Sequence, residues 1–411
     1  MRILVYGINH APELTGIGKY TGEMVEWLVA QGHEVCVVTA PPYYPAWKVR
    51  NDYHPARYVT ESLDGATVYR CPLWVPAQPK GVMRMLHLFS FALSSLPVML
   101  AQAAWKPQVV FTIEPAFFGA PTALFTARLA RAPAWLHVQD FEIDAAFELG
   151  LLPSGGSIHR FALALERFFT RQFQRVSTIS PNMVQRSLTK GVSPDYAVLF
   201  PNWVDTDAIY PLTGQNSFRK ELGLSEDKLV LLYSGNMGEK QGLEILGLLA
   251  QRFSPDARLH FLFCGDGAFR PQLEQMVKGM SNVSLLPLQP IERLNELLNV
   301  ADIHLLPQRA DAADLVMPSK LTGMLSSGRP VLATAAAGTQ VAQVVEGRGI
   351  AVPANDADAA CQAIHLLVND RNLRQSMGLS ARAYAVEHLG KEQVLRRFED
   401  ELKRLPQTPE F

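Results

Sequence analysis

The chain has 411 residues, of which 48% are hydrophobic and 19% are charged, and its formal net charge at pH 7 is −1. A chain of this length is too long for one ordinary hydrophobic core, so we expect two domains. The composition is typical of a globular protein and excludes an intrinsically disordered one. The near-zero net charge gives no support to nucleic-acid binding, and no nucleic-acid partner is expected.

Four cysteines are widely separated and form no Cys-x-x-Cys motif: Cys36, Cys71, Cys264 and Cys361. This spacing favours a reducing compartment over a disulfide framework or a zinc site. Ile3-Leu4-Val5-Tyr6 follows the initial Met1-Arg2 directly and is typical of a strand, with no apolar signal-peptide segment after it. We therefore expect a cytoplasmic protein.

One long apolar segment, from Met85 to Trp105, contains no Asp, Glu, Lys or Arg. Its length would allow it to cross a bilayer. Its polar residues and Pro97 make a helix packed on a sheet the simpler explanation. Between a true span and shallow docking on the inner leaflet, we favour docking, helped by Lys80 and Arg84.

Strands and helices alternate through the first half of the chain, which predicts a parallel α/β sheet. We expect strands at 2–6, 34–39, 109–112, 134–138, 176–180 and 197–200, and helices at about 20–31 and 158–171. Ser180-Pro181 is expected to start another helix. The polar segment between Trp47 and Tyr69 is expected to be a loop.

Gly16 and Gly18 fall in the expected loop between the first strand and the first helix. The third glycine is Gly22, so the spacing is not G-x-G-x-x-G, and the second strand ends at Thr39 where a ribose-binding acid would be expected. A dinucleotide site is therefore not supported. Two alternatives remain, a glycine loop whose backbone approaches an anion closely and a plain turn.

Two further places in the first half suit ligand binding. The segment Pro41 to Trp47 is rich in proline and aromatic residues, and Tyr43 and Tyr44 suit sugars and apolar carriers because aromatic faces and phenol hydroxyls match them. An inert surface loop is the alternative. Glu114 follows the strand 109–112 at its carboxyl end, where open α/β sheets bind ligands.

His137 lies at the end of the expected strand 134–138 and is followed closely by Asp140. A histidine at a strand end can donate to a bound hydroxyl or take its proton near neutral pH. The alternative is a structural histidine bonded to the backbone. Asp140 is a weaker candidate for orienting a hydroxyl.

The sequence contains two Asp-x-Asp motifs, Asp205-Thr206-Asp207 and Asp356-Ala357-Asp358. The first follows a Pro-Asn turn, and we interpret both as capping residues of turns or helices, with no metal site. The second half then repeats the alternating pattern, with strands expected at 229–233, 259–264, 283–288, 303–306 and 331–334. The tail from 372 to about 405 is expected to be helical.

The segment Met317 to Gly338 carries the most specific pattern in the chain. Pro318 suits the first turn of a helix, and Gly328 is the expected stop. A helix start offers unpaired N–H groups that favour phosphate, and Ser319 and Lys320 add a hydroxyl and a cation there. The pattern favours a seat for the diphosphate of a nucleotide-linked sugar, with an ordinary helix start as the alternative.

The segments Pro318-Ser319-Lys320 and Ser327-Gly328-Arg329-Pro330-Val331 resemble the donor-site signature of retaining glycosyltransferases of family 4. His137-Val138-Gln139-Asp140 and Gly265-Asp266-Gly267 resemble further motifs of that family. The similarity covers nearly the whole chain. It is greatest to the bacterial branch that builds exopolysaccharides, in particular the colanic-acid glycosyltransferases.

The resemblance implies the GT-B fold, an α/β architecture of two Rossmann-like parallel-sheet domains facing each other across a cleft. It implies an acceptor-binding domain at 1–196, a linker at 197–210 and a nucleotide-sugar-binding domain at 211–384. By analogy with the family, a C-terminal helix at about 385–411 packs back on the first domain.

The resemblance also implies functional residues, without any cofactor. The donor would contact glycine loops and the segment around Lys320, namely Gly16, Gly18, Asn236, Lys240, Gly265, Ser319 and Leu321. Lys320 would neutralise the leaving diphosphate, and His137 would lie near the reacting sugar with Asp140. Tyr43, Tyr44 and Glu114 are the candidates for acceptor binding.

The sequence departs from the family pattern in two places. Aligned on Gly328, the two family glutamates are replaced by Leu315 and Gly323. The arginine and lysine that the second glycine loop normally carries are replaced by Asn236 and Gln241. The exopolysaccharide branch often shows this Asn/Gln form.

The implied reaction is transfer of a sugar, with retention, from a nucleotide-sugar donor to a polyprenyl-diphosphate-linked saccharide at the inner membrane. GDP-fucose is the first donor expected from the colanic-acid resemblance, and a UDP-sugar is the second. Two alternatives remain open. One is an epimerase of nucleotide sugars with the same fold, and the other is a non-catalytic partner subunit that binds nucleotide sugar, as the replaced residues suggest.

Overall fold

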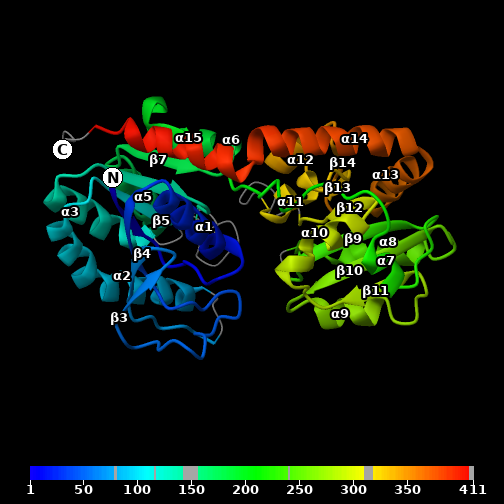
Figure 1. Cartoon of the computed structure of the whole chain (residues 1–411), viewed down its shortest axis with the longest axis horizontal. Coiled ribbons are helices and arrows are strands. Elements are labelled where there is room, and N and C mark those ends of the chain that lie inside the picture. The colour runs from blue at the N-terminus through cyan, green and yellow to red at the C-terminus, as the bar shows by residue number, and fades with distance from the viewer. Residues whose placement is uncertain (78–80, 115–116, 142–155, 239–240, 310–317, 407–411) are drawn as a thin grey trace. The chain divides into compact units, whose positions relative to one another are not determined.

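The computed structural model describes residues 1–77, 81–114, 117–141, 156–238, 241–309 and 318–406. The chain forms two compact units, Met1–Pro201 with Leu395–Phe411 and Asn202–Val394 (Figure 1). Each unit contains its own sheet of mostly or wholly parallel strands. The α/β class predicted from the sequence is therefore confirmed.

The described part of the first unit contains an eight-stranded sheet. In spatial order its strands are β3 (Val59–Leu63), β4 (Ala66–Arg70), β2 (Glu34–Thr39), β1 (Arg2–Tyr6), β5 (Val109–Glu114), β6 (Ala134–Val138), β7 (Arg175–Thr178) and β8 (Ala197–Leu199). All neighbouring strands are parallel except β3 and β4. Strand β1 lies inside the sheet, and its fully buried apolar run explains why the sequence predicts it to the residue.

The antiparallel hairpin β3–β4 corrects the expectation of a loop as far as Tyr69. Its turn is Asp64-Gly65, and both residues have positive φ, 49° and 80°. Asp-Gly between two strands is a strong hairpin signal because this turn requires two positive φ angles. The hairpin is hard to recognise because β3 is an edge strand with polar, partly exposed side chains.

The helices of the first unit follow the α/β alternation. In the described residues up to Pro201 they are α1 (Gly16–Ala30), α2 (Val82–Gln102), α3 (Ala120–Ala130), α5 (Ser157–Thr170) and α6 (Pro181–Thr189). Helix α6 begins as predicted at Ser180-Pro181, and the Ser180 side chain accepts a hydrogen bond from the backbone N–H of Met183. Helix α1 begins at Gly16, earlier than predicted, so the glycine pair forms its first turn.

An aromatic cluster forms the centre of the first unit. Phe398, on α15 (Lys391–Lys403), stacks on Phe200 with ring centroids 4.3 Å apart and meets the edges of Phe111 and Trp135. All four rings are buried. The last helix of the chain therefore supplies part of the core of the unit that contains the first strand.

The second unit contains a six-stranded parallel sheet in its described residues. Its strands, in spatial order, are β11 (Val283–Leu286), β10 (Leu259–Asp266), β9 (Leu229–Asn236), β12 (Ile303–Leu306), β13 (Val331–Thr334) and β14 (Gly349–Val352). Its helices are α7 (Ser217–Glu221), α8 (Glu244–Arg252), α9 (Arg270–Met276), α10 (Leu294–Val300), α11 (Lys320–Ser326), α12 (Gln340–Val345), α13 (Ala357–Asn369) and α14 (Arg371–Tyr384). Strands β12 and β13 have the predicted bounds.

The predicted helical tail is present but is not continuous. Helix α14 is followed by a π-helical turn, Ala385–Leu389, and α15 starts after Gly390. Beside this break, Val204 accepts a hydrogen bond from the N–H of Lys391 and donates one to the carbonyl of Leu389, both at 2.9 Å. Two segments far apart in the sequence thus run side by side here.

Both Asp-x-Asp motifs act as predicted, as capping residues. The Asp205 carboxylate accepts hydrogen bonds from the backbone N–H groups of Asp207 and Ala208 at 3.0 and 2.9 Å. Asp356 caps α13 by accepting from the N–H of Ala359 at 2.9 Å. In each case the carboxylate satisfies backbone donors at the start of a turn or helix.

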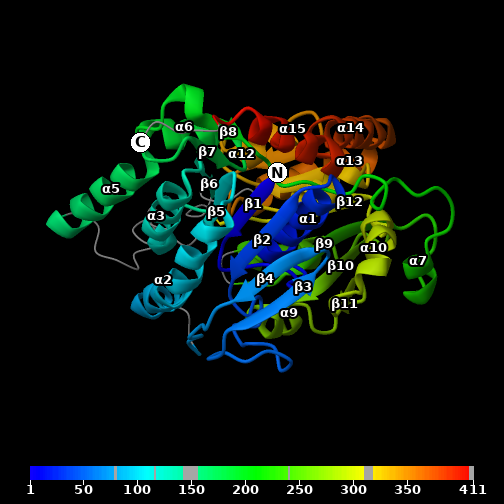
Figure 2. The same cartoon turned by 60° about the vertical axis from the view of Figure 1, so that its left-hand side comes forward.

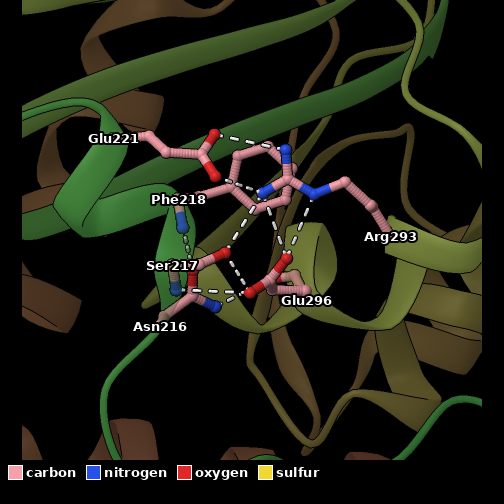
Figure 3. A network of polar contacts seen from close by, with 6 residues as sticks. All are labelled: Asn216, Ser217, Phe218, Glu221, Arg293 and Glu296. Atoms are coloured by element: carbon pink, nitrogen blue, oxygen red, sulfur yellow. Dashed lines mark hydrogen bonds and ion pairs between the residues drawn. The ribbon is translucent and has the colours of Figure 1, made fainter.

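A surface network ties the short helix α7 to α10 (Figure 3). The Arg293 guanidinium lies 3.9 Å from the ring centre of Phe218 and donates to Glu221 at 2.7 Å and Glu296 at 3.1 Å. Ser217 bonds to the same Glu296. The network holds α7 in place just before strand β9, and the carboxyl end of β9 carries the candidate site.

Candidate active site

The carboxyl end of the second sheet brings together two of the predicted glycine motifs. Gly235 pairs with Gly265, and Asn236 pairs with Asp266, as the last residues of β9 and β10. A Cβ atom on Gly265 would collide with the carbonyl oxygen of Gly235. Asn236 and Asp266 are exposed. The two loops therefore form a polar edge at which backbone atoms can be approached closely.

Lys320, the first residue of α11, lies over this edge. Its ammonium donates to the Tyr233 hydroxyl and to the side-chain oxygen of Gln241, each at 3.2 Å, and lies 4.2 Å from the centre of the Tyr233 ring. Its Cδ atom is 3.5 Å from the position that a Cβ on Gly235 would occupy. The predicted lysine and the predicted glycine loop thus meet in the structure.

Burial lowers the pKa of Lys320 to about 7. Its two hydrogen-bond acceptors, Tyr233 and Gln241, are uncharged. Among the described residues the ammonium therefore has no anionic hydrogen-bond partner, and a bound anion would supply one. Tyr233 could not be recognised from the sequence, because a tyrosine inside a buried strand carries no separate signal.

The other predicted residues near Lys320 have different positions. Ser319 is exposed, and its side chain makes no capping hydrogen bond. Leu321 does not fit the predicted donor contact. Its side chain is fully buried in the core of the second unit, and its N–H donates to the carbonyl of Pro318 at 3.0 Å.

The replaced family residues are only partly visible. Lys240 and Leu315 lie outside the residues that the structure describes. At Gly323 a Cβ atom would lie 3.3 Å from Cδ1 of Leu298, so this position is packed against α10. Gln241, in place of a family cation, is the hydrogen-bond partner of Lys320.

In the first unit, the glycine pair is in close contact with its surroundings. Gly16 has a φ of +63°, and a Cβ atom there would lie 3.3 Å from Cε1 of Tyr44. A Cβ atom on Gly18 would collide with the carboxylate of Glu13. Local packing therefore explains glycine at both positions, together with the positive φ at Gly16.

Glu13 links the glycine turn to the predicted acceptor segment. One carboxylate oxygen accepts the backbone N–H groups of Tyr43 and Tyr44 at 3.0 and 2.9 Å, and the other accepts from the side chain of Asn9 at 2.9 Å. Glu13 is buried, and burial raises the pKa of its carboxyl group. Glu13 is not among the residues predicted from the sequence. The available signal is an acidic residue inside an otherwise uncharged loop at a strand end.

The two predicted acceptor tyrosines differ in exposure. The Tyr43 ring is buried and meets His87 of α2 edge-on at 4.8 Å and Trp47 at 5.5 Å. Tyr44 is half-buried, and burial raises the pKa of its hydroxyl. Tyr44 is thus the more accessible of the pair, and Tyr43 holds the segment on α2.

His137 lies within the aromatic core at the carboxyl end of β6. One ring nitrogen bonds to the Ser177 hydroxyl at 2.8 Å, and the ring lies against Phe200 and Phe111 with centroid distances of 4.9 and 5.9 Å. Burial lowers the pKa of His137 to about 3. The imidazole is therefore uncharged near neutral pH and is a poor base.

Glu114 and Asp140 occupy the same edge of the first sheet. Glu114 is the last residue of β5 and is buried, and Asp140 follows β6 and is half-buried. Over the described parts of both units, no cluster of three or more His, Cys, Asp or Glu side chains has the geometry to hold a metal ion.

The architecture is that of a known enzyme class. A model of the glycosyl transferase 4-like domain matches residues 15–203, and one of glycosyl transferases group 1 matches residues 228–370. Sucrose-phosphate synthase from Thermosynechococcus elongatus superposes with a TM-score of 0.76 at 17% identity, over 98% of each chain. Anabaena Alr3699/HepE in complex with UDP-glucose gives 0.67 at 14% identity, over 98% of this chain and 100% of that one. The fold is GT-B, and the protein is a glycosyltransferase.

The particular family follows from a full-length relative. The chain is 44% identical over 415 residues to the putative colanic acid biosynthesis glycosyl transferase WcaI of Escherichia coli (strain K12), covering 98% of this chain and 100% of that protein. The chain belongs to the family 4 glycosyltransferases that include this relative. The resemblance found in the sequence is thereby confirmed.

Proposed function

We propose that the protein transfers a sugar, with retention, from a nucleotide-sugar donor to a lipid-linked saccharide in the assembly of a colanic-acid-type exopolysaccharide. The full-length relative named for colanic acid biosynthesis supports the pathway. The structural neighbour in complex with UDP-glucose supports a nucleotide-sugar donor. GDP-fucose is the first donor to test, followed by UDP-sugars.

The position of Lys320 is the observation that carries the proposal. Its ammonium lies over the paired ends of β9 and β10, with uncharged hydrogen-bond partners and a pKa of about 7. A diphosphate beside it would replace neutral acceptors with negative charge. The contact strengthens as the glycosidic bond breaks and charge builds on the leaving group, which is the condition for stabilising a transition state.

In the proposed step, the bond from the sugar C1 to the diphosphate oxygen breaks and a bond from C1 to the acceptor oxygen forms on the same face. The acceptor hydroxyl must lose its proton. With a pKa of about 3, His137 is a weaker base than a departing diphosphate oxygen, so we assign the proton to the diphosphate. His137 and Asp140 are left with hydrogen-bonding roles near the sugar.

The acceptor is assigned to the first unit. Tyr44 and Glu114 lie at the carboxyl edge of its sheet, and Glu13 holds the tyrosine segment against the first turn of α1. This arrangement supports a rigid platform rather than an inert loop. A polyprenyl-diphosphate carrier would require the protein to work at the cytoplasmic face of the membrane.

The test incubates the purified protein with lipid-linked saccharide acceptors and a panel of nucleotide sugars, then measures the mass of the lipid product. We expect a gain of one sugar residue with one donor. No gain with any donor, together with tight binding of a nucleotide sugar, would replace the proposal with the non-catalytic partner subunit. Conversion of the sugar without acceptor would identify an epimerase.

A further inference from the structure

Helix α2 presents an apolar stripe to solvent. Val82, Leu86, Phe89, Leu93 and Leu96 are all exposed, with Leu93 at 56%, and they recur every three or four residues along one side. This is the helical period, so the five side chains share one face. Exposed apolar groups in such a row mark a binding surface more often than chance.

The opposite side of α2 belongs to the core of the first unit. Phe91 and Met99 are fully buried, and the Ser95 hydroxyl bonds to the Tyr6 hydroxyl at 2.7 Å. By length and composition α2 is the one helix in the described residues that could cross a membrane. A span would have to break these contacts, so a helix lying along a surface fits better.

Two neighbouring helices also carry exposed apolar side chains. Helix α2 packs against α3, and α3 packs against α5, as Figure 2 shows. Helix α3 exposes Phe125 and Leu129, and α5 exposes Phe161, Leu165 and Phe168, again at helical spacing, with Phe161 at 68%. We call the exposed apolar side chains of these three helices the apolar face.

The exposed charges that α2, α3 and α5 themselves carry have one sign. Helices α2 and α3 contain no acidic residue. The acidic residue of α5, Glu166, is buried and paired with Lys190 at 2.5 Å. The basic side chains on or capping these helices are Arg84, Arg128, Arg131, Arg160, Arg167 and Arg171.

We propose that the apolar face docks on an anionic lipid bilayer surface. Apolar side chains flanked by arginines suit a membrane with negative headgroups, which adds attraction to the burial of apolar area. A second copy of the chain is disfavoured as occupant, because two identical faces would bring like charges together. The proposal deepens the proposed function and rests on it for the identity of the membrane-bound acceptor.

The same helix holds the acceptor segment. On α2, His87 meets Tyr43 edge-on and bonds to the carbonyl of Trp74 at 2.7 Å. Arg84 lies close enough to Tyr44 to lower the pKa of its hydroxyl against the raising effect of burial. His87 and Arg84 lie on the side of α2 away from the exposed stripe, so docking through the stripe would place the tyrosine segment behind the helix, one helix diameter (~10 Å) from the headgroups that anchor a lipid-linked saccharide.

The test is flotation of the purified full-length protein with vesicles of phosphatidylcholine alone or mixed with phosphatidylglycerol. We expect binding to the mixed vesicles that weakens as salt is raised. The double variant Leu86→Glu with Leu93→Glu should reduce partitioning at least about tenfold. The matched control, Leu366→Glu with Leu379→Glu, changes two exposed leucines of α13 and α14 and should bind as the parent does.

The charge contribution is tested separately. Arg160→Gln with Arg167→Gln should weaken binding to mixed vesicles by about fivefold for each arginine. The control Lys278→Gln with Arg371→Gln, on the second unit, should leave it unchanged. Equal binding of all variants, or binding independent of phosphatidylglycerol, would overturn the proposal.

Further measurements distinguish membrane docking from the proposed transferase function and from dimerisation. Titration with a nucleoside diphosphate should be unchanged in the Leu86→Glu, Leu93→Glu variant, whereas transfer to an acceptor embedded in mixed vesicles should fall. Vesicle binding without transfer by the parent would leave docking intact and reject the proposed function. A parent dimer in ultracentrifugation that the same variant dissociates, without any vesicle binding, would identify a second copy as the occupant and reject the lipid.

Discussion

The two sheets end in carboxyl edges of opposite character. In the first unit several polar groups at the edge are buried and hydrogen-bonded within the unit, Glu13 to the N–H of Tyr43 and His137 to the hydroxyl of Ser177. In the second unit Asn236 and Asp266 are exposed, and the one cation described above, Lys320, has only uncharged acceptors. Hydrogen bonds within the unit hold the loops of the first edge, whereas in the described part of the second edge the ammonium of Lys320 has no anionic hydrogen-bond partner.

This difference is consistent with acceptor binding by the first unit and donor binding by the second. Loops that are already held by hydrogen bonds within the unit form a rigid surface, and such a surface suits binding of an acceptor that must be oriented. An ammonium without an anionic partner, such as that of Lys320, suits a ligand that brings negative charge, such as a diphosphate. Substitutions should therefore affect stability first in the first unit and donor use first in the second.

The largest effect is expected from Lys320→Ala. Loss of the ammonium should lower kcat/KM for the donor by about 100-fold, or about 2.7 kcal/mol, because no other described cation lies on Tyr233 and Gln241. The measurement is the rate of lipid-product formation at limiting donor.

Lys320→Arg is the matched control, since it keeps the charge, and it should retain more activity than Lys320→Ala. A Lys320→Ala enzyme with parental kcat/KM would remove the residue from the donor site.

A smaller effect with a different signature is expected from Glu13→Ala. The substitution leaves the N–H groups of Tyr43 and Tyr44 and the Asn9 amide without their acceptor. We expect a loss of about 2 kcal/mol in the free energy of unfolding and a fall in acceptor use. Urea unfolding and acceptor KM are the measurements.

Glu13→Gln keeps an oxygen acceptor for the tyrosine amides and should recover most of the stability. Parental stability of Glu13→Ala, alongside impaired donor binding alone, would contradict the scaffold role of the first edge.

Acid should destabilise the protein through buried histidines. Burial lowers the pKa of His10, His137 and His304 to about 3, so between about 6.5 and 3 the unfolded chain binds more protons than the folded one. The contribution of these histidines to the free energy of unfolding is fully present above this window. It falls as the pH drops through the window, by up to about 1.4 kcal/mol per pH unit for each histidine.

The measurement is urea unfolding at several acidic pH values. His137→Gln should reduce the slope of the unfolding free energy against pH by the amount that corresponds to one proton, about 1.4 kcal/mol per pH unit. An unchanged slope would show that His137 is protonated in the folded state, which would restore a role in proton transfer.

The smallest expected effect is proton uptake on donor binding. Lys320 has a pKa of about 7 in the free protein, and a bound diphosphate should raise it. Calorimetry in two buffers of different ionisation enthalpy should therefore detect little uptake below about pH 6 and up to about one proton per nucleotide near pH 8. Lys320→Arg should show none, because guanidinium stays charged. Equal uptake by that variant would assign the proton elsewhere.

Much of the fold could be predicted because buried parallel strands have a strong signal. The apolar runs of β1, β2 and β6 have the predicted bounds. The hairpin β3–β4 could not be predicted from the hydrophobic pattern. An edge strand with polar side chains shows little alternation of apolar and polar residues. Helix α1 starts at Gly16, before the predicted start, and this earlier start could not be predicted because glycine is a weak helix former and its pattern favours a loop.

The site was harder to predict than the fold. Motifs placed Gly235, Gly265 and Lys320 at one edge. The partners of Lys320 lie 87 and 79 residues away in the sequence, so Tyr233 and Gln241 could be recognised only in three dimensions. Leu321 shows the opposite limit, because proximity to a motif says nothing about which way a helical side chain points.

The position of Phe398 has a practical consequence for dissecting the molecule. Because this ring completes the aromatic cluster around Phe111 and Phe200, residues 1–201 alone are an incomplete fragment with a hole at their centre. A truncated version should be recovered in soluble form only if the closing peptide is added back or fused ahead of Met1. Circular permutation, rather than simple truncation, is therefore the way to obtain the acceptor half by itself.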